Sequence, residues 1–124
     1  MAVVVDASAL AAVAFNEPGG GSVTAALAGH ALYAPTLIDY ELASIGWKKL
    51  RRHPDRSESI LANVTRTRSL AIARVSPAFS AVLALARLLD ITPYDASYVW
   101  VARAMGVPLV TLDQRLARAA QRGT

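Results

Sequence analysis

Four of the nine acidic residues of the chain lie where carboxylates could do chemistry. Asp6 directly follows a short run of valines, and Asp113 follows a second apolar run near the C-terminus. Glu41 and Asp95 each lie near the start of an expected helix. Right-handed crossovers in an α/β fold bring strand ends and helix starts to one edge of the sheet, where such folds bind their ligands. We therefore expect these four carboxylates to converge at that edge.

Four carboxylates in one crevice repel one another, and proteins usually neutralise such a cluster by binding a divalent cation. Oxygen ligands without His or Cys suit Mg²⁺ or Mn²⁺ better than Zn²⁺. A metal site of this kind next to a basic surface favours the hydrolysis of phosphodiester bonds. The candidate metal ligands and catalytic residues are Asp6, Glu41, Asp95 and Asp113.

Each of these acids also has a simpler explanation. Asp6 and Asp113 could each N-cap the helix that follows them. Asp95 could form a capping box with Thr92 or complement the helix dipole. Glu41, on the apolar side of its helix, could reach water from the margin of the apolar stripe. These explanations apply one residue at a time, whereas a shared sheet edge accounts for all four acids.

The basic residues are concentrated in one block. Residues 1–47 contain four acids and no Lys or Arg, whereas residues 48–74 contain eight bases and two acids. A basic block can neutralise the phosphates of a nucleic acid, although it can also be a solvated helix face. The contrast with the acidic N-terminal part favours a nucleic acid as a partner. The candidate contacts to it are Lys48, Lys49, Arg51 and Arg52.

Strands and helices are expected to alternate along the chain. We expect strands at residues 3–5, 31–34, 70–75 and 107–112, and helices at 7–15, 23–28, 37–52, 57–67, 77–89, 93–105 and 114–121. Thr36 is expected to N-cap the third helix in a capping box with Asp39. The sixth helix is apolar nearly all round and is expected to be buried. The alternation predicts an α/β sandwich around a parallel sheet.

Length and composition predict a single soluble domain. The chain has 124 residues and a net charge of +4, and it contains no cysteine, which suits a reducing cytosol. Its N-terminus lacks the basic region of a signal peptide. The long uncharged stretch 18–38 contains three consecutive glycines and two prolines, which argues against a membrane span. We therefore expect a cytoplasmic protein without membrane association.

Four segments resemble PIN domains, and most closely the VapC-type toxin ribonucleases. They read VVVDASAL at 3–10, APTLIDYE at 34–41, TPYDA at 92–96 and TLDQRL at 111–116, in the order of the family. The resemblance implies a PIN-like three-layer α/β/α sandwich with a four- to five-stranded parallel sheet, spanning residues 1–124. It also implies a Mg²⁺- or Mn²⁺-dependent endoribonuclease toxin of a type II toxin–antitoxin system. Such a toxin hydrolyses RNA with a metal-activated water, forms a homodimer, and is neutralised by a cognate VapB-like antitoxin.

The resemblance also assigns roles to individual positions. The positions that match the family's core metal ligands are Asp6, Glu41 and Asp95, with Asp113 as the fourth acid. Ser8 and Thr111 match small hydroxyl residues that orient the carboxylates. The family usually continues into a final strand after the last helix, whereas this chain ends at Thr124, so the fifth strand is in doubt.

Two other classes of protein share parts of this pattern. A catalytically inactive PIN-like module could bind RNA or protein, but it would be expected to lose some of the four acids. A phospho-accepting receiver or phosphatase-like domain also needs an Asp after its first strand. Such a domain fits poorly, because Ser8 occupies the second position after that Asp and no Lys follows Lys49.

Three large apolar residues of the third helix could form a docking patch for the antitoxin. These are Tyr40, Trp47 and Leu50. An exposed apolar stripe of this kind suits the binding of a partner helix. Large apolar side chains are more often buried, so the same residues could instead belong to the core.

Overall fold

The structure, a computed structural model, describes residues 1–122 and contains a parallel sheet. Its four strands are β1 (Ala2–Val5), β2 (Ala31–Pro35), β3 (Ile72–Val75) and β4 (Leu109–Val110), in the order β3-β2-β1-β4. Every neighbouring pair is parallel, with Val4 opposite Tyr33 on one side and Leu109 on the other. The carboxyl ends of the strands therefore lie at a single edge, as the sequence predicted.

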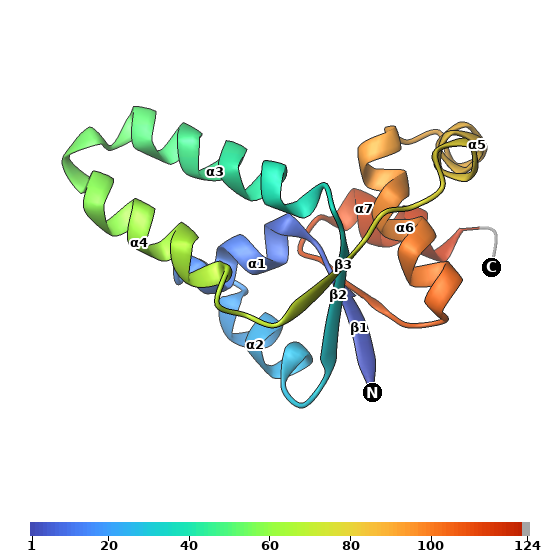
Figure 1. Cartoon of the computed structure of the whole chain (residues 1–124), viewed down its shortest axis with the longest axis horizontal. Helices are drawn as coiled ribbons and strands as arrows, with labels where there is room; N and C mark the ends of the chain where they lie inside the picture. Colours follow the sequence, from blue (N-terminus) through green and yellow to red (C-terminus); the bar gives the residue numbers. More distant parts are fainter. Residues whose placement is uncertain (123–124) are drawn as a thin grey trace.

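Helices cover both faces of this sheet, which confirms the three-layer sandwich (Figure 1). One layer contains α1 (Ala7–Ala14), α2 (Gly20–Leu27), α3 (Ile38–Arg52) and α4 (Ser57–Thr67), and the other contains α5 (Phe79–Leu89), α6 (Pro93–Met105) and α7 (Gln114–Gln121). A short 3₁₀ turn (Pro54–Arg56) joins α3 to α4 in a long hairpin that extends away from the sheet. No helix among residues 1–122 is long and apolar enough to cross a membrane.

The core lies where β1 meets the helices on its two faces. Val4 and Val5 are completely buried, and Leu10 of α1 packs against them from one side. Tyr98 and Val101 of α6 belong to the same cluster on the other side. The prediction that this apolar helix is central is therefore confirmed. Burying each of the large apolar side chains in this core stabilises the fold by roughly 1.5–3 kcal/mol. This packing holds the strand ends next to the candidate site in place.

Several element boundaries differ from the sequence prediction. Helix α2 begins at Gly20, earlier than expected, because Gly19 takes a left-handed φ of 89°. A Cβ on Gly20 would meet the Ala12 carbonyl oxygen at 2.7 Å, so this position needs glycine to let α2 pack against α1. The last two strands and α5 are shorter than predicted. Strand β4 in particular pairs only with β1, because it lies at the edge of the sheet.

The predicted capping box of Thr36 and Asp39 is wrong. Helix α3 starts after Leu37 without a side-chain cap. Asp39 instead accepts two hydrogen bonds from the Arg74 guanidinium of β3, at 2.9 and 2.8 Å, and forms an ion pair with Arg68 at 2.9 Å. A bidentate charged pair is stronger than a neutral cap. Arg74 also holds the pKa of Asp39 below its usual range. The hydrogen bonds between Asp39 and Arg74 connect α3 to β3.

Candidate active site

The four predicted acids line one cavity at the carboxyl edge of the sheet. This cavity, called here the four-acid cavity, has a volume of about 250 Å³. Its lining residues are Asp6, Ala7, Ser8, Glu41, Ser44, Ile45, Lys48, Asp95, Tyr98, Asp113 and Leu116. They lie on, or directly before, α1, α3, α6 and α7, the helices that start at this edge. The structure thus brings together residues separated by more than one hundred positions in the chain.

Asp6 has the most restrained carboxylate of the four. Its Oδ1 accepts hydrogen bonds from the Ala9 backbone N–H at 2.9 Å and from the Ser8 hydroxyl at 2.8 Å. Its Oδ2 accepts a hydrogen bond from the Thr111 hydroxyl at 2.6 Å. The residue is 4% exposed, and this burial raises its pKa despite the three hydrogen bonds. Asp6 therefore N-caps α1 and lines the cavity at the same time.

The hydroxyls of Ser8 and Thr111 join the two ends of the chain around Asp6. Besides donating to Asp6, the Thr111 hydroxyl accepts the Asp113 N–H at 3.0 Å. The Ser8 hydroxyl accepts the Leu112 N–H at 3.2 Å. A hydroxyl can donate and accept at once, which suits it to link a carboxylate to a backbone amide. These contacts fix the orientation of Asp6 and the path of the chain into α7.

Glu41 is held by a tyrosine that the sequence did not single out. The Tyr98 hydroxyl of α6 donates to Glu41 Oε1 at 2.5 Å. Tyr98 is only 1% exposed, and a buried tyrosine hydroxyl usually needs a partner. Burial raises the pKa of both groups. The sequence does contain a signal for Tyr98: it lies three residues after Asp95 on an apolar helix, and this spacing places both side chains on the same side of the helix. Ser44, one turn after Glu41, was missed in the same way.

Asp95 and Asp113 both take part in helix caps, Asp95 through its backbone N–H and Asp113 through its side chain. The Asp95 N–H donates to the Thr92 hydroxyl at 3.1 Å, so the predicted cap at this helix is present. Asp113 Oδ1 caps α7 by accepting the N–H groups of Arg115 and Leu116, at 2.9 and 3.2 Å. Capping and lining the cavity are compatible for these residues too. A capping explanation alone does not account for their shared location.

The cavity is electrostatically unfavourable for its own carboxylates. Burial is the main cause of the raised pKa values of Asp6, Glu41 and Asp95. The negative charges of neighbouring acids raise these pKa values further, as Asp113 does for both Asp6 and Asp95. As the side chains stand, no three Asp, Glu or His residues within 1–122 are arranged to hold one metal ion. The donor set nevertheless consists of carboxylate oxygens, the ligands that hard divalent cations prefer.

The side chains of the four basic residues proposed to contact RNA point to different places. Lys48 lines the four-acid cavity. Lys49 turns away, forming an ion pair with Glu17 at 2.7 Å and lying over the Phe15 ring. Arg51 lies over the Trp47 ring, 4.8 Å from its centroid. Arg52 is exposed at the end of α3. A role for these residues in RNA binding stays a prediction, and Lys48 is the member placed at the site.

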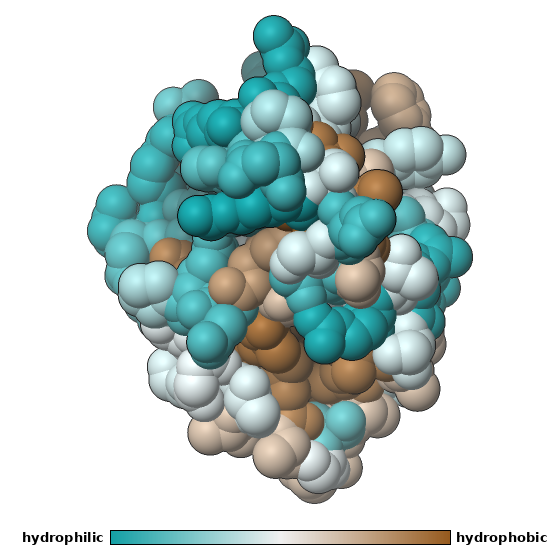
Figure 2. Space-filling model, turned by 90° about the vertical axis from the view of Figure 1, so that its left-hand side faces the viewer, coloured by the Kyte–Doolittle hydropathy of each residue, from teal (hydrophilic) through white to brown (hydrophobic). Residues whose placement is uncertain are grey.

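The predicted apolar patch on α3 is partly exposed. Tyr40 is 78% exposed and Trp47 is 54% exposed, whereas Leu50 is half-buried. Figure 2 shows the end of the molecule formed by the α3–α4 hairpin and the helices below it. Hydrophilic side chains cover most of that end, and an apolar strip runs between them. The expectation that all three residues belong to the core is therefore wrong.

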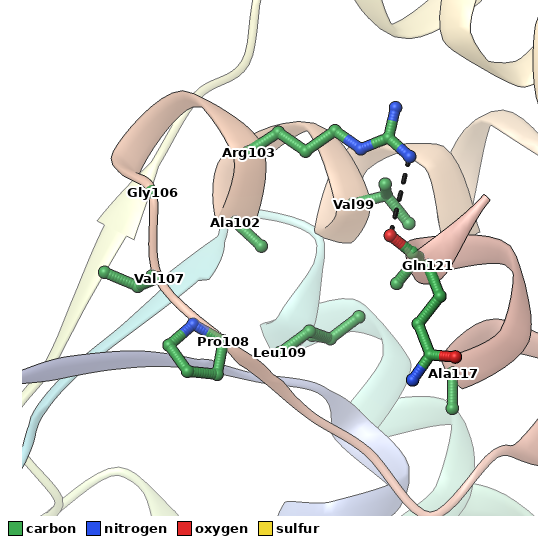
Figure 3. A pocket seen from close by; sticks show the side chains of 10 residues that line it. Val99, Ala102, Arg103, Gly106, Val107, Pro108, Leu109, Ala117 and Gln121 are labelled. Atoms are coloured by element: carbon green, nitrogen blue, oxygen red, sulfur yellow. Dashed lines mark hydrogen bonds between the residues drawn. The ribbon is translucent and has the colours of Figure 1, made fainter. Parts of the chain in front are cut away.

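A larger cavity lies at a different place and has no carboxylate in its lining within residues 1–122. It has a volume of about 530 Å³ and lies between α6, β4 and α7 (Figure 3). Aliphatic residues such as Val99, Val107 and Leu109 form most of its wall. Arg103 extends across it and donates to the Ala120 carbonyl oxygen at 3.5 Å. A single cation among aliphatic groups makes no catalytic arrangement, so the smaller four-acid cavity is the candidate active site.

A parallel sheet between two helical layers, with acids from four helix starts in one cavity, is the arrangement expected of a PIN domain. The family model of the PIN domain matches residues 3–122, and the chain belongs to this family. Among its curated relatives is ribonuclease VapC3 of Pyrobaculum aerophilum, 33% identical over 122 residues, which cover 94% of this chain and 93% of the relative. Ribonuclease VapC9 of Mycobacterium tuberculosis is 35% identical over 127 residues, covering 96% and 91%.

Solved structures give the same fold. The crystal structure of PAE2754 from Pyrobaculum aerophilum superposes with a TM-score of 0.80 and 27% identity, covering 98% of this chain and 86% of that one. The Mycobacterium tuberculosis toxin VapC20, which cleaves the sarcin-ricin loop, superposes with a TM-score of 0.67 over 95% of both chains. At 15% identity the second likeness shows the fold alone. The predicted PIN-like architecture is thus confirmed.

Proposed function

We propose that this chain is a metal-dependent endoribonuclease toxin of a type II toxin–antitoxin system. The observation that carries the proposal is the convergence of four carboxylates in one cavity of a PIN domain. The names of its relatives, ribonucleases VapC3, VapC9 and VapC12, support RNA as the substrate. The reaction is the hydrolysis of RNA phosphodiester bonds.

Asp6, Glu41 and Asp95 would hold Mg²⁺ or Mn²⁺, with Asp113 holding the metal or its waters. When bound, the cation would supply Lewis-acid chemistry, activating water and neutralising charge that develops on the phosphate. The chain's own residues position the ligands. Ser8 and Thr111 fix both oxygens of Asp6, and the Tyr98 hydroxyl fixes one oxygen of Glu41.

Replacing Asp95 with Asn tests this proposal. We expect Asp95→Asn to lose at least about 100-fold in RNA cleavage, because losing a ligand costs no less than losing a group that merely orients one. The matched control is Asp55→Asn, an exposed acid in the turn between α3 and α4, which should cleave RNA like the parent. The measurement is cleavage of single-stranded RNA by purified protein with Mn²⁺, beside growth arrest on expression.

The same variant reports on folding. The pKa of Asp95 is raised above its unfolded value, so ionised Asp95 lowers stability as the pH rises through that pKa. In EDTA at neutral pH, the Asp95→Asn variant should therefore melt at the same temperature as the parent or higher. Full cleavage by Asp95→Asn would refute the assignment. A parent protein that binds RNA without cleaving it would support the inactive module instead.

Tyr98→Phe is expected to impair catalysis without removing a metal ligand. Phe keeps the packing of α6 but leaves Glu41 Oε1 without its donor, which raises the pKa of Glu41 further. RNA cleavage should fall roughly 10-fold to 100-fold, the usual cost of losing a group that orients a ligand. The acidic limb of the pH–rate profile should also move to higher pH. An unchanged pH profile would show that the hydroxyl only fills space.

Two protein partners are proposed, an antitoxin and a second copy of this chain. A VapB-like antitoxin would neutralise the toxin, and the exposed side chains of Tyr40 and Trp47 on α3 offer it an apolar contact. The protein is proposed to form a homodimer, in keeping with the family. Co-expression with the product of a neighbouring small reading frame, followed by size-exclusion chromatography with light scattering, tests both proposals.

A further inference from the structure

A second polar cavity adjoins the four-acid cavity. It has a volume of about 200 Å³ and is called here the arginine pocket. Its lining residues are Asp90, Ile91, Asp95, Asp113, Arg115, Arg118 and Arg122. Asp95 and Asp113 line both cavities, so the two spaces meet at these carboxylates. Lys48 lines the four-acid cavity from α3, whereas Arg115 and Arg118 lie on α7 and Arg122 directly follows it.

The pattern of α7 places its arginines on one side. Leu116 and Ala119 are buried against the fold. Arg115 and Arg118 are three residues apart and share the side of α7 next to this buried stripe, and Arg122 follows the helix as its C-cap. The charge of Arg115 reaches Asp95, whose pKa it lowers against the effect of burial. Three guanidinium groups are thus directed to the side of the candidate active site where Asp95 and Asp113 lie.

The three arginines differ in the contacts that they make within residues 1–122. Arg122 is anchored, because its Nη2 donates to the Leu89 carbonyl oxygen at 2.7 Å. By contrast, the Arg118 side chain makes no hydrogen bond or ion pair with any of residues 1–122, and Arg115 forms no ion pair within that range. A guanidinium group offers paired N–H donors that match the oxygens of a phosphate. Arg115 and Arg118 are therefore available for an external phosphate.

We propose that the arginine pocket binds a backbone phosphate of the RNA substrate, adjacent to the scissile phosphate. This inference rests on the proposed function. An RNA strand whose scissile phosphate occupies the four-acid cavity must carry its next phosphates out of that cavity. The arginine pocket opens from it at Asp95 and Asp113, so a neighbouring phosphate meets Arg115 and Arg118 there. The strand thus runs from Lys48 of α3, across the acids, to α7.

The test compares two double variants in an Asp6→Asn background, which keeps RNA intact. One variant is Arg115→Ala/Arg118→Ala. The matched control is Arg56→Ala/Arg87→Ala, which removes two exposed arginines that line neither cavity. The probe is a short fluorescein-labelled single-stranded RNA of mixed sequence, and its binding is followed by fluorescence anisotropy over a series of KCl concentrations. Melting temperatures of all variants check that the fold is kept.

The α7 variant should bind RNA roughly 10-fold more weakly than the control. The slope of log K against log[KCl] should become shallower by about 0.7 for one lost phosphate contact on a single strand. Replacing RNA phosphates one at a time with neutral methylphosphonates gives a second readout. The Asp6→Asn protein should be sensitive at a linkage next to the mapped cleavage position, and the α7 variant should lose that sensitivity.

The outcomes separate this inference from the proposed function. If the unmodified protein cleaves RNA while both double variants bind alike, the arginine pocket is not a phosphate site and the ribonuclease proposal survives. An unchanged methylphosphonate profile in the α7 variant would overturn the inference in the same way. If the unmodified protein neither binds nor cleaves RNA, both proposals fail together.

Discussion

Asp6→Asn is expected to abolish RNA cleavage while leaving the fold intact. Asn is as good an N-cap as Asp, so the bond from the Ala9 N–H to Oδ1 should persist. The Thr111 hydroxyl, which donates to Asp6 Oδ2, can turn to accept from the new amide group. Only the negative charge is lost. We expect a fall of at least about 100-fold in cleavage, measured by single-turnover kinetics with Mn²⁺.

This substitution separates the two explanations of Asp6. If Asp6 served only as a cap, Asn would preserve activity, and Asp6→Ala would lower stability by about 1 kcal/mol. If it is a metal ligand, Asn and Ala should be equally inactive, and only Ala should destabilise α1. Because the pKa of Asp6 is raised in the folded state, Asp6→Asn should not lower the melting temperature in EDTA at neutral pH. Retained cleavage by the Asn variant would refute the role in metal binding.

Divalent cations are expected to stabilise the unmodified protein and to be essential for its activity. The carboxylates are buried and repel one another only in the folded state. A cation bound among them therefore stabilises the folded state relative to the unfolded chain. At a free metal concentration about 100 times its Kd, linkage adds about 2.7 kcal/mol to the free energy of unfolding. For a chain of this size we expect the melting temperature to rise by roughly 10 °C. Differential scanning fluorimetry with Mn²⁺, Mg²⁺ and EDTA measures this shift.

Two comparisons make the metal prediction specific. The shift should shrink as the pH falls, because protons compete with the metal for carboxylates whose pKa values are raised. It should also be much smaller in Asp95→Asn than in Asp55→Asn. RNA cleavage should stop in EDTA and return with Mn²⁺. Cleavage that persists in EDTA, or equal shifts in both variants, would contradict a role for the four carboxylates in binding metal.

The sequence predicted the acids of the site because their positions follow from local rules. A strand ends before Asp6 and Asp113, and helices begin near Glu41 and Asp95. Once the strands are parallel, their carboxyl ends must share an edge. The side chains therefore converge even though no local pattern encodes the contact between them. The parallel sheet and the buried position of α6 could be predicted from apolar patterning in the same way.

Long-range pairings could not be predicted from local patterns. Asp39 fits a capping box with Thr36, yet Arg74, 35 residues away, offers two charged hydrogen bonds and binds it instead. The bond between Tyr98 and Glu41 spans 57 residues. Similarly, Lys49 belongs to the basic block by sequence but turns to Glu17 across 32 residues. Which way a charged side chain points depends on elements that meet only after folding.

The hydrogen bonds among Asp6, Ser8 and Thr111 have a consequence for biosynthesis. The two bonds that Thr111 makes with Ser8 and Asp6 join residues 103 and 105 positions apart, so they form only after β4 has paired with β1 at the edge of the sheet. A nascent chain that has not yet released Thr111 and Asp113 from the ribosome lacks both the fourth acid and the hydroxyl that orients the first. Such a chain has no complete site. The chain is therefore expected to gain the ability to cleave RNA only after Thr111 and Asp113 have left the ribosome.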